Sequence, residues 1–133
     1  MTWRDEVRGL REQGFDVLDW LSAVQQPDGT VMITACFLRA DQPGDARLLT
    51  GPAPVESIAD LYPSAQWHER ETAEMFEVDF PGHPDPRPLL LPADQRGALR
   101  KQTPLPARLQ TWPGAVDPAK PRRTQEPPGT PWP

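Results

Sequence analysis

The sequence has little cysteine, no long apolar run and no apolar signal segment. Cys36 is the single cysteine among 133 residues, so the chain can form no internal disulfide. It also cannot hold an iron–sulfur cluster by itself, because such a cluster needs about four thiolates. No stretch approaches the roughly 20 apolar residues of a membrane-spanning helix, and residues 1–7 are largely polar. The sequence therefore predicts an intracellular chain that does not cross a membrane.

The length and charge narrow the classes of partner. A chain of 133 residues fits one domain. The formal net charge of −5 provides no general attraction to nucleic acid or to an anionic membrane surface. We therefore expect no nucleic-acid partner.

Prolines divide the chain unevenly. Of the 19, only five precede residue 81, and proline removes the backbone donors that helices and interior strands need. Residues 117–133 hold six prolines and no Val, Ile, Leu, Met or Phe, so this tail cannot bury a core of its own. We expect an α+β domain over 1–92, an extended segment over 93–116, and a Pro-rich tail over 117–133 that is disordered or bound to a partner.

The part of the chain before Pro81 predicts a small two-layer fold. A first helix, carrying Trp3, Val7 and Leu10 on one face, is capped by Thr2 and ended by Gly14. The other predicted elements are strands over 15–25, 30–38 and 46–50 and helices over 54–62 and 65–76. Together they predict a two-layer α+β sandwich, in which a small mixed or antiparallel sheet carries helices on one face.

The strand over 15–25 is apolar on both faces, which indicates a well-covered strand. The core of the chain itself is the favoured explanation. A partner covering the second face is the alternative.

Residues 67–91 are the most informative stretch. The segment from Trp67 to Glu77 carries five charges and His68, and a proline-rich loop with its own His83 and Arg87 follows. The predicted helix has no strongly apolar stripe, so packing on its own sheet explains it poorly. Arg70 and Glu74 are spaced to pair with each other along it.

Three interpretations of this stretch remain open from the residues alone. His68, His83 and the nearby glutamates suggest a metal-dependent enzyme, but the H-E-x-x-H arrangement is absent, since Thr72 stands one turn after His68. Cys36 lies in an apolar strand, where cysteine usually acts as a small buried hydrophobe. No nucleotide-binding loop or Gly-x-Ser-x-Gly is present, which disfavours an independent enzyme. The second interpretation is a solvated helix followed by a rigid exposed loop. The third is a surface that docks on a partner protein.

The motif resembles the signature of a known family. Glu69-Arg-Glu-Thr-Ala-Glu-Met-Phe76, followed by Val78-Asp-Phe-Pro-Gly-His-Pro-Asp85 and Arg87-Pro-Leu-Leu-Leu91, is similar to the thirty-kilodalton subunit family of respiratory complex I. In bacteria this is the C subunit of NADH–quinone oxidoreductase, here in a short form. The chain departs from the family pattern at Glu77 and Pro88, where the family usually has glycine and a second arginine, and at Gln102-Thr103, where it usually has Asp-Phe.

The resemblance implies a structural and assembly subunit without a cofactor or catalytic site of its own. Such a subunit belongs to the hydrophilic arm of a proton-translocating NADH:quinone oxidoreductase, peripheral on the cytoplasmic face of the bacterial membrane. Its expected partners are the quinone-cavity subunit, of the forty-nine-kilodalton type, and the iron–sulfur subunits, while FMN and the clusters belong to partner subunits. The equivalent subunit of a complex I-like membrane hydrogenase is the alternative. The expected docking residues are Glu69, Arg70, Glu71, Glu74, His83 and Arg87.

Overall fold

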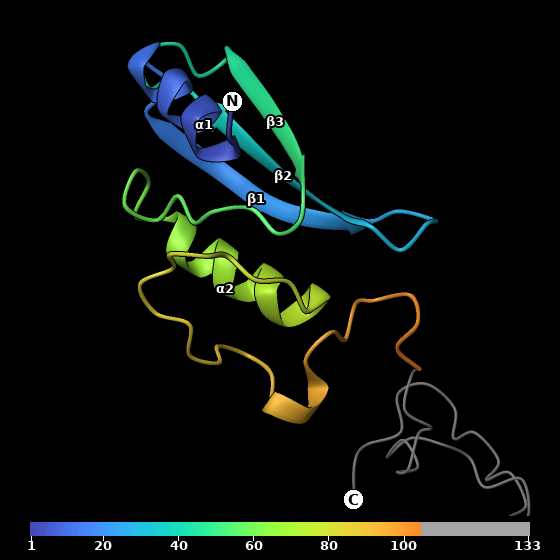
Figure 1. Cartoon of the computed structure of the whole chain (residues 1–133). Coiled ribbons are helices and arrows are strands. Elements are labelled where there is room, and N and C mark those ends of the chain that lie inside the picture. The colour runs from blue at the N-terminus through green and yellow to red at the C-terminus, as the bar shows by residue number, and fades with distance from the viewer. Residues whose placement is uncertain (105–133) are drawn as a thin grey trace, which may run out of the picture.

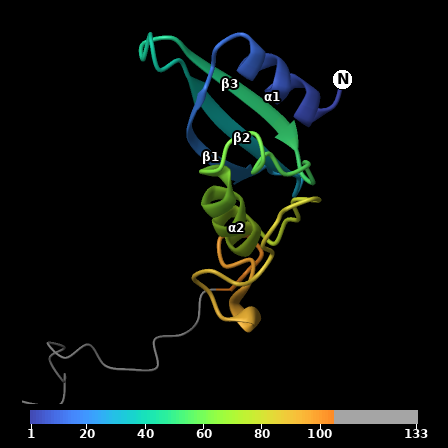
Figure 2. The ribbon, with the colours of Figure 1, turned by 90° about the vertical axis from the view of Figure 1, so that its left-hand side faces the viewer.

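The computed structural model describes residues 1–104 and confirms the predicted α+β fold. Its elements in chain order are α1 (Trp3–Glu12), β1 (Val17–Gln25), β2 (Val31–Leu38), β3 (Ala46–Pro52), α2 (Ala65–Phe76) and the short 3-10 helix η1 (Ala93–Gln95). Two views place α1 against the sheet, and α2 with its following loop below them (Figure 1 and Figure 2). The predicted tail over 117–133 lies outside the described residues.

Helix α1 begins and ends as its sequence predicts. The Thr2 hydroxyl accepts from the backbone N–H of Asp5 at 3.2 Å, and the Asp5 carboxylate accepts from the backbone N–H of Thr2 at 3.1 Å. This reciprocal cap satisfies donors that a helix start otherwise leaves free. After the helix, Gly14 adopts a φ of 94°, which favours glycine.

The three strands form one antiparallel sheet in the order β1-β2-β3. Their inner faces bury Leu21, Ile33 and Phe37 against α1, the segment after β3, and α2. Tyr62 also joins this core, donating its hydroxyl to the carbonyl of Phe15 at 2.5 Å. The sheet thus carries its helices on one face.

The favoured explanation, that the core of the chain itself covers both faces of β1, is wrong for the described part of the chain. A bulge between Leu18 and Trp20 adds one residue, so Leu18 and Leu21 both point to the core. Trp20 and Val24 point to the other face, with 38% and 60% of their surface exposed.

The predicted helix over 54–62 is also wrong. Residues 53–64 form an irregular segment with bends and turns between β3 and α2, although Val55, Ile58 and Tyr62 are buried as a helix face would bury them. The backbone N–H of Ser57 donates to the carbonyl of Pro81 at 2.8 Å, and that of Ile58 donates to the Glu69 carboxylate. Donors that a helix would use internally are therefore satisfied by distant parts of the chain.

Residues 93–104 return to the body of the domain. The backbone N–H groups of Gly97 and Leu99 donate to the carbonyls of Glu74 and Met75 at 2.6 and 2.8 Å. The N–H of Lys101 donates to the buried Gln25 side chain at 2.7 Å. Among residues 1–104, no helix has the length and apolar character needed to cross a membrane.

Candidate functional site

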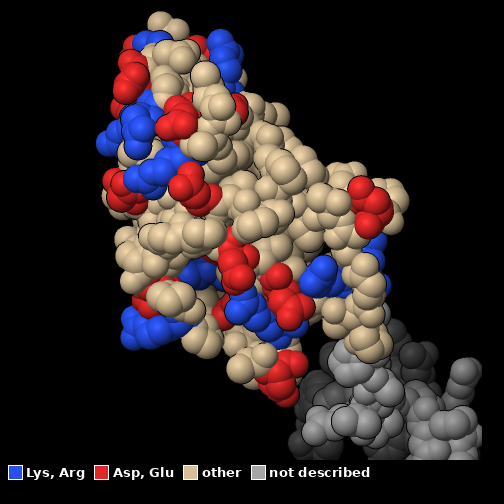
Figure 3. Space-filling view, viewed as in Figure 1, with Lys and Arg blue, Asp and Glu red and all other residues tan. Residues whose placement is uncertain are grey.

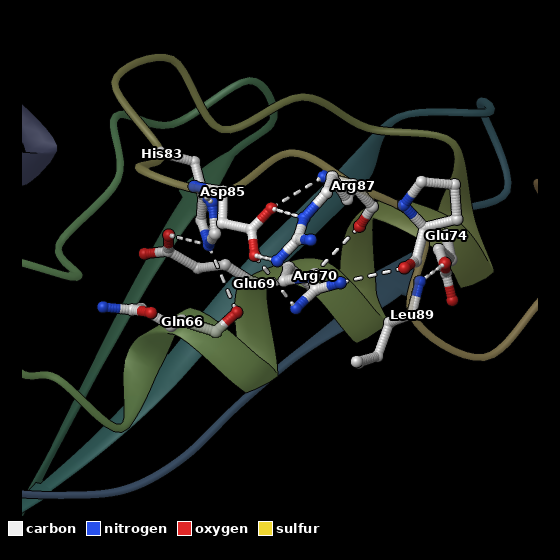
Figure 4. Close-up of polar contacts among 9 residues, drawn as sticks. Gln66, Glu69, Arg70, Glu74, His83, Asp85, Arg87 and Leu89 are labelled. Carbon is white, nitrogen blue, oxygen red and sulfur yellow. Dashed lines mark hydrogen bonds and ion pairs between the residues drawn. The ribbon is translucent and has the colours of Figure 1, made fainter.

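The candidate site is formed by α2 and the loop over 78–92, hereafter the α2–loop surface. Side chains from α2 point toward the loop, and loop side chains and backbone groups point back (Figure 4). Charged side chains gather over α1 and again around α2 and the loop (Figure 3).

Glu69 is the most deeply buried member of the site. It is 1% exposed, and its carboxylate accepts from the Ser57 hydroxyl at 2.6 Å and the Ile58 N–H at 2.8 Å. Burial raises the pKa of Glu69, while these two hydrogen bonds partly oppose the shift. This side chain therefore ties α2 to the segment over 53–64.

His83 lies beside Glu69 and joins the loop to α2. Its Nδ1 accepts from the backbone N–H of Asp85 at 3.0 Å, so in the neutral ring the proton sits on Nε2. Nε2 lies 3.1 Å from the carbonyl of Gln66 and 3.7 Å from the Glu69 carboxylate. Both ring nitrogens are thus occupied within the chain.

Glu74 holds the far end of the loop. Its carboxylate accepts from the consecutive backbone N–H groups of Leu89, Leu90 and Leu91, the last two at 2.8 and 3.2 Å. Burial disfavours the charged form, but these three donors outweigh it and lower the pKa of Glu74. Because Pro88 and Pro92 have no N–H, this carboxylate takes every backbone donor between residues 88 and 92.

Arg70 fixes the middle of the loop. Its guanidinium donates to the carbonyls of Arg87 and Pro88 at 3.0 and 2.8 Å and lies 3.5 Å from the Asp85 carboxylate. It also lies 5.6 Å from the centre of the Trp67 ring, which it stacks against. The expected pairing of Arg70 with Glu74 is replaced by these contacts, because loop groups engage both side chains.

Three residues form the outward part of the surface. Trp67 is 61% exposed, Glu71 is exposed, and the Arg87 side chain is 80% exposed while holding Asp85 at 2.7 Å. The hydrogen bond from Arg87 lowers the pKa of Asp85 well below its usual range. The surface thus presents an aromatic ring beside exposed charges, on a backbone that internal hydrogen bonds hold in place. These features are typical of a binding surface.

Between α2 and the loop lies a cavity of about 360 Å³. Glu69 and His83 contribute to its lining together with Ala73, Val78 and Leu91. The remaining lining residues are Arg70, Glu74, Asp79, Phe80, Pro81, Pro86, Arg87, Pro88, Pro92, Ala93 and Arg96.

The structure brings five of the six expected docking residues into one bonded group and leaves Glu71 on the exposed side of α2. Glu69 and Glu74 are buried against the segment over 53–64 and against the loop, so packing within the chain accounts for polar residues that packing on the sheet alone explains poorly. The sequence interpretation missed Ser57 and the carboxylate of Asp85. For Glu74, the run of three N–H donors between Pro88 and Pro92 was a usable signal of its role as an acceptor, whereas no comparable signal marks Ser57 or Asp85.

The metal interpretation gains no geometric support from this part of the chain. Within residues 1–104, no three side chains of His, Cys, Asp or Glu are grouped so that they could hold a metal ion. Cys36 is buried as expected, and burial together with the charge of Asp19 raises the pKa of its thiol.

Glu77 ends α2 in a left-handed conformation, with φ 53° and ψ 49°. Such a conformation costs an L-residue about 1 kcal/mol or more, and glycine avoids the cost. We expect Glu77→Gly to raise the free energy of unfolding by about 1 kcal/mol, seen as a melting temperature several degrees higher. The lost ion pair with Arg100, at 3.4 Å and largely exposed, contributes little.

The control for this change at the end of α2 is Glu77→Ala. It removes the same carboxylate but keeps the Cβ atom, so it should give no increase in melting temperature. A Glu77→Gly chain that melts at or below the wild type would contradict the account.

Fold and site together define an α+β domain whose acidic helix and proline-rich loop are locked to each other. The chain belongs to the family described as respiratory-chain NADH dehydrogenase, 30 Kd subunit, whose model matches residues 1–109. The resemblance found in the sequence is thereby confirmed.

Relatives come from several kinds of oxidoreductase. NAD(P)H-quinone oxidoreductase subunit J of Prochlorococcus marinus (strain MIT 9211) is 34% identical over 110 residues, which cover 71% of this chain and 60% of that protein. The C/D subunit of NADH-quinone oxidoreductase from Gluconacetobacter diazotrophicus is 40% identical over 84 residues, covering 59% of this chain and 14% of that protein. The C subunit of F(420)H(2) dehydrogenase from Methanosarcina mazei is 43% identical over 58 residues, covering 42% and 37%. The chain thus spans at most about three fifths of the length of these relatives.

Proposed function

We propose that this chain is an assembly subunit of the hydrophilic arm of a proton-translocating NADH:quinone oxidoreductase. It docks on the quinone-cavity subunit, of the forty-nine-kilodalton type, and on iron–sulfur subunits, at the cytoplasmic face of the bacterial membrane. It performs no catalytic step and holds no cofactor, and FMN and the iron–sulfur clusters reside in its partners. Membership of the 30 Kd subunit family supports the proposal that the chain is a subunit of such a complex.

One observation supports the docking role most strongly. The α2–loop surface is fixed by buried carboxylates, so its outward groups Trp67, Glu71 and Arg87 are presented on a rigid backbone. A rigid surface loses little entropy on association. Tryptophan and arginine are also among the residues most enriched where binding energy is concentrated. Glu69 and Glu74 then serve docking indirectly, by holding the loop.

The test is charge reversal at the two exposed positions. We expect Glu71→Arg and Arg87→Glu, made together, to reduce the chain recovered in the purified complex about tenfold. That loss corresponds to about 1.4 kcal/mol of binding free energy. Because both side chains are exposed, the melting temperature of the free chain should change little. The control is Glu12→Arg, an exposed reversal on α1. Normal assembly and normal quinone reductase activity in the double variant would refute the docking role.

A second candidate concerns the electron donor of the complex. The Methanosarcina mazei relative is named as a subunit of an F(420)H(2) dehydrogenase, so the second candidate is a related complex that takes electrons from a donor other than NADH. The membrane hydrogenase alternative belongs to the same class and stays a prediction. Quinone reduction by the complex purified through this chain, assayed with NADH, reduced F420 and hydrogen in turn, decides among them.

A further inference from the structure

The outer face of the sheet, turned away from the core, is unusually apolar. The strand register places twelve residues there in four rows of three across β1, β2 and β3. In order these rows are Val17, Leu38 and Ala46; Trp20, Cys36 and Leu48; Ser22, Thr34 and Thr50; and Val24, Met32 and Pro52. None of the twelve carries a charge, and the only polar row consists of hydroxyl residues, of which Thr34 and Thr50 lie 3.1 Å apart.

This face is open within the described part of the chain. Leu48 is 65% exposed, Val24 60%, Val17 39% and Trp20 38%. An antiparallel sheet with one solvated face normally alternates apolar and polar residues, so the solvated face is polar. Here all three strands present apolar side chains to that face. Contiguous exposed apolar patches of this kind mark interaction sites.

None of the twelve residues is charged, although Asp19, at the bulge in β1, lies near enough to Cys36 for its charge to raise the pKa of that thiol. Every ion pair among residues 1–104 involves α1, the loops or α2, and none includes any of the twelve outer-face residues. A charged group placed on this face would lose its water without gaining a partner, which costs several kcal/mol. The complementary surface is therefore uncharged and apolar.

The size of the face argues against a dimer of this chain. Three strands about 4.8 Å apart, over paired stretches about 24 Å long, give a face of roughly 350 Å². A stable two-body interface buries about 800 Å² on each partner. The outer face is thus too small to hold two copies together alone and needs a partner that is also held by another contact.

We infer that the outer face packs against an uncharged, apolar surface of a second subunit of the same complex. This inference rests on the proposed function, because the α2–loop surface supplies the additional contact. The charged α2–loop surface then restricts the orientation in which the chain binds. The apolar outer face of the sheet contributes binding free energy through the apolar area that it removes from water.

Photo-crosslinking in the assembled complex tests the inference. The photoreactive residue p-benzoylphenylalanine is placed at Val24 or at Leu48, with Gln42 in the exposed loop between β2 and β3 as the matched control. We expect positions 24 and 48 to crosslink to another subunit of the complex, at least tenfold more than position 42. Crosslinks to a second copy of this chain or to its own residues 105–133 would overturn the inference. So would a lack of crosslinks in a complex that contains the chain.

A second measurement covers the case in which the photoreactive residue disturbs assembly. Val24→Glu together with Leu48→Glu should lower incorporation at least fivefold, while Gln42→Glu leaves it unchanged. The free double variant should keep a cooperative melt, because both side chains are largely exposed. Normal incorporation of the double variant overturns the inference but leaves the proposed function standing. A wild-type chain that is absent from any oxidoreductase complex overturns both.

Discussion

Replacing Glu69 by alanine is expected to lower the free energy of unfolding by about 3 kcal/mol, because the Ile58 N–H and the Ser57 hydroxyl lose their buried acceptor. The matched control is Glu71→Ala, two residues along the same helix and exposed, which should change stability by no more than about 0.5 kcal/mol. Urea titration of the full chain measures both. Equal stabilities for the two variants would contradict the role assigned to Glu69.

Glutamine at position 69 separates the charge from the hydrogen bonds. Its carbonyl can still accept from Ile58, so Glu69→Gln should cost less than Glu69→Ala. Because burial raises the folded-state pKa of Glu69, its contribution is fully present below its unfolded pKa and is lost as pH rises through the folded one. The stability advantage of the wild type over Glu69→Gln should therefore shrink as pH rises from about 4 toward 7. An advantage that grows over this range would contradict the direction of the shift.

Replacing Glu74 by alanine should release the loop and cost about 2 kcal/mol, since three backbone N–H groups lose one shared acceptor. Hydrogen exchange at Leu89, Leu90 and Leu91 is expected to accelerate at least tenfold relative to the wild type. The amides of the central strand β2 serve as the internal control and should be protected as before. Unchanged exchange at the three leucines would show that something else holds the loop.

The pH dependence of the Glu74 contribution has the opposite sign to that of Glu69. Its pKa is lowered in the folded chain, so its contribution is present above the unfolded pKa and is lost as pH falls through the folded one. In the wild type, the loop amides should lose protection on acidification below about pH 4. In Glu74→Gln this loss should be much weaker. A Glu74→Gln variant with the same acid response as the wild type would assign that response to another carboxylate.

Local patterns predicted most of the fold. The cap at Thr2, the three strands and α2 each depend on residues close together in the sequence, so their signals are readable there. The segment over 54–62 failed because its apolar spacing is compatible with a helix, while its backbone donors bond to Glu69 and Pro81. Those hydrogen bonds join residues far apart in the sequence, and the spacing of apolar residues along the chain does not reveal them.

The sequence predicted where the site lies but not which of its residues are buried and which are exposed. Charges and histidines marked residues 67–91, yet nothing local distinguishes the buried Glu69 and Glu74 from the exposed Glu71. Burial depends on how the loop folds back over the helix. The bulge at Leu18 could not be predicted from local sequence either. Its one added residue decides which apolar side chains of β1 face the core.

The contacts of Glu69 also limit how far this domain can be treated as modular. One carboxylate holds a hydroxyl and an amide from the segment before α2 and stands beside a histidine from the loop after it. In a chimera that exchanges any one of these three stretches for the corresponding stretch of a relative, Ser57, Glu69 and His83 have to be transferred or retained as a set. The exchangeable unit therefore runs from the end of β3 through the loop, and a boundary drawn at either end of α2 would cut through it.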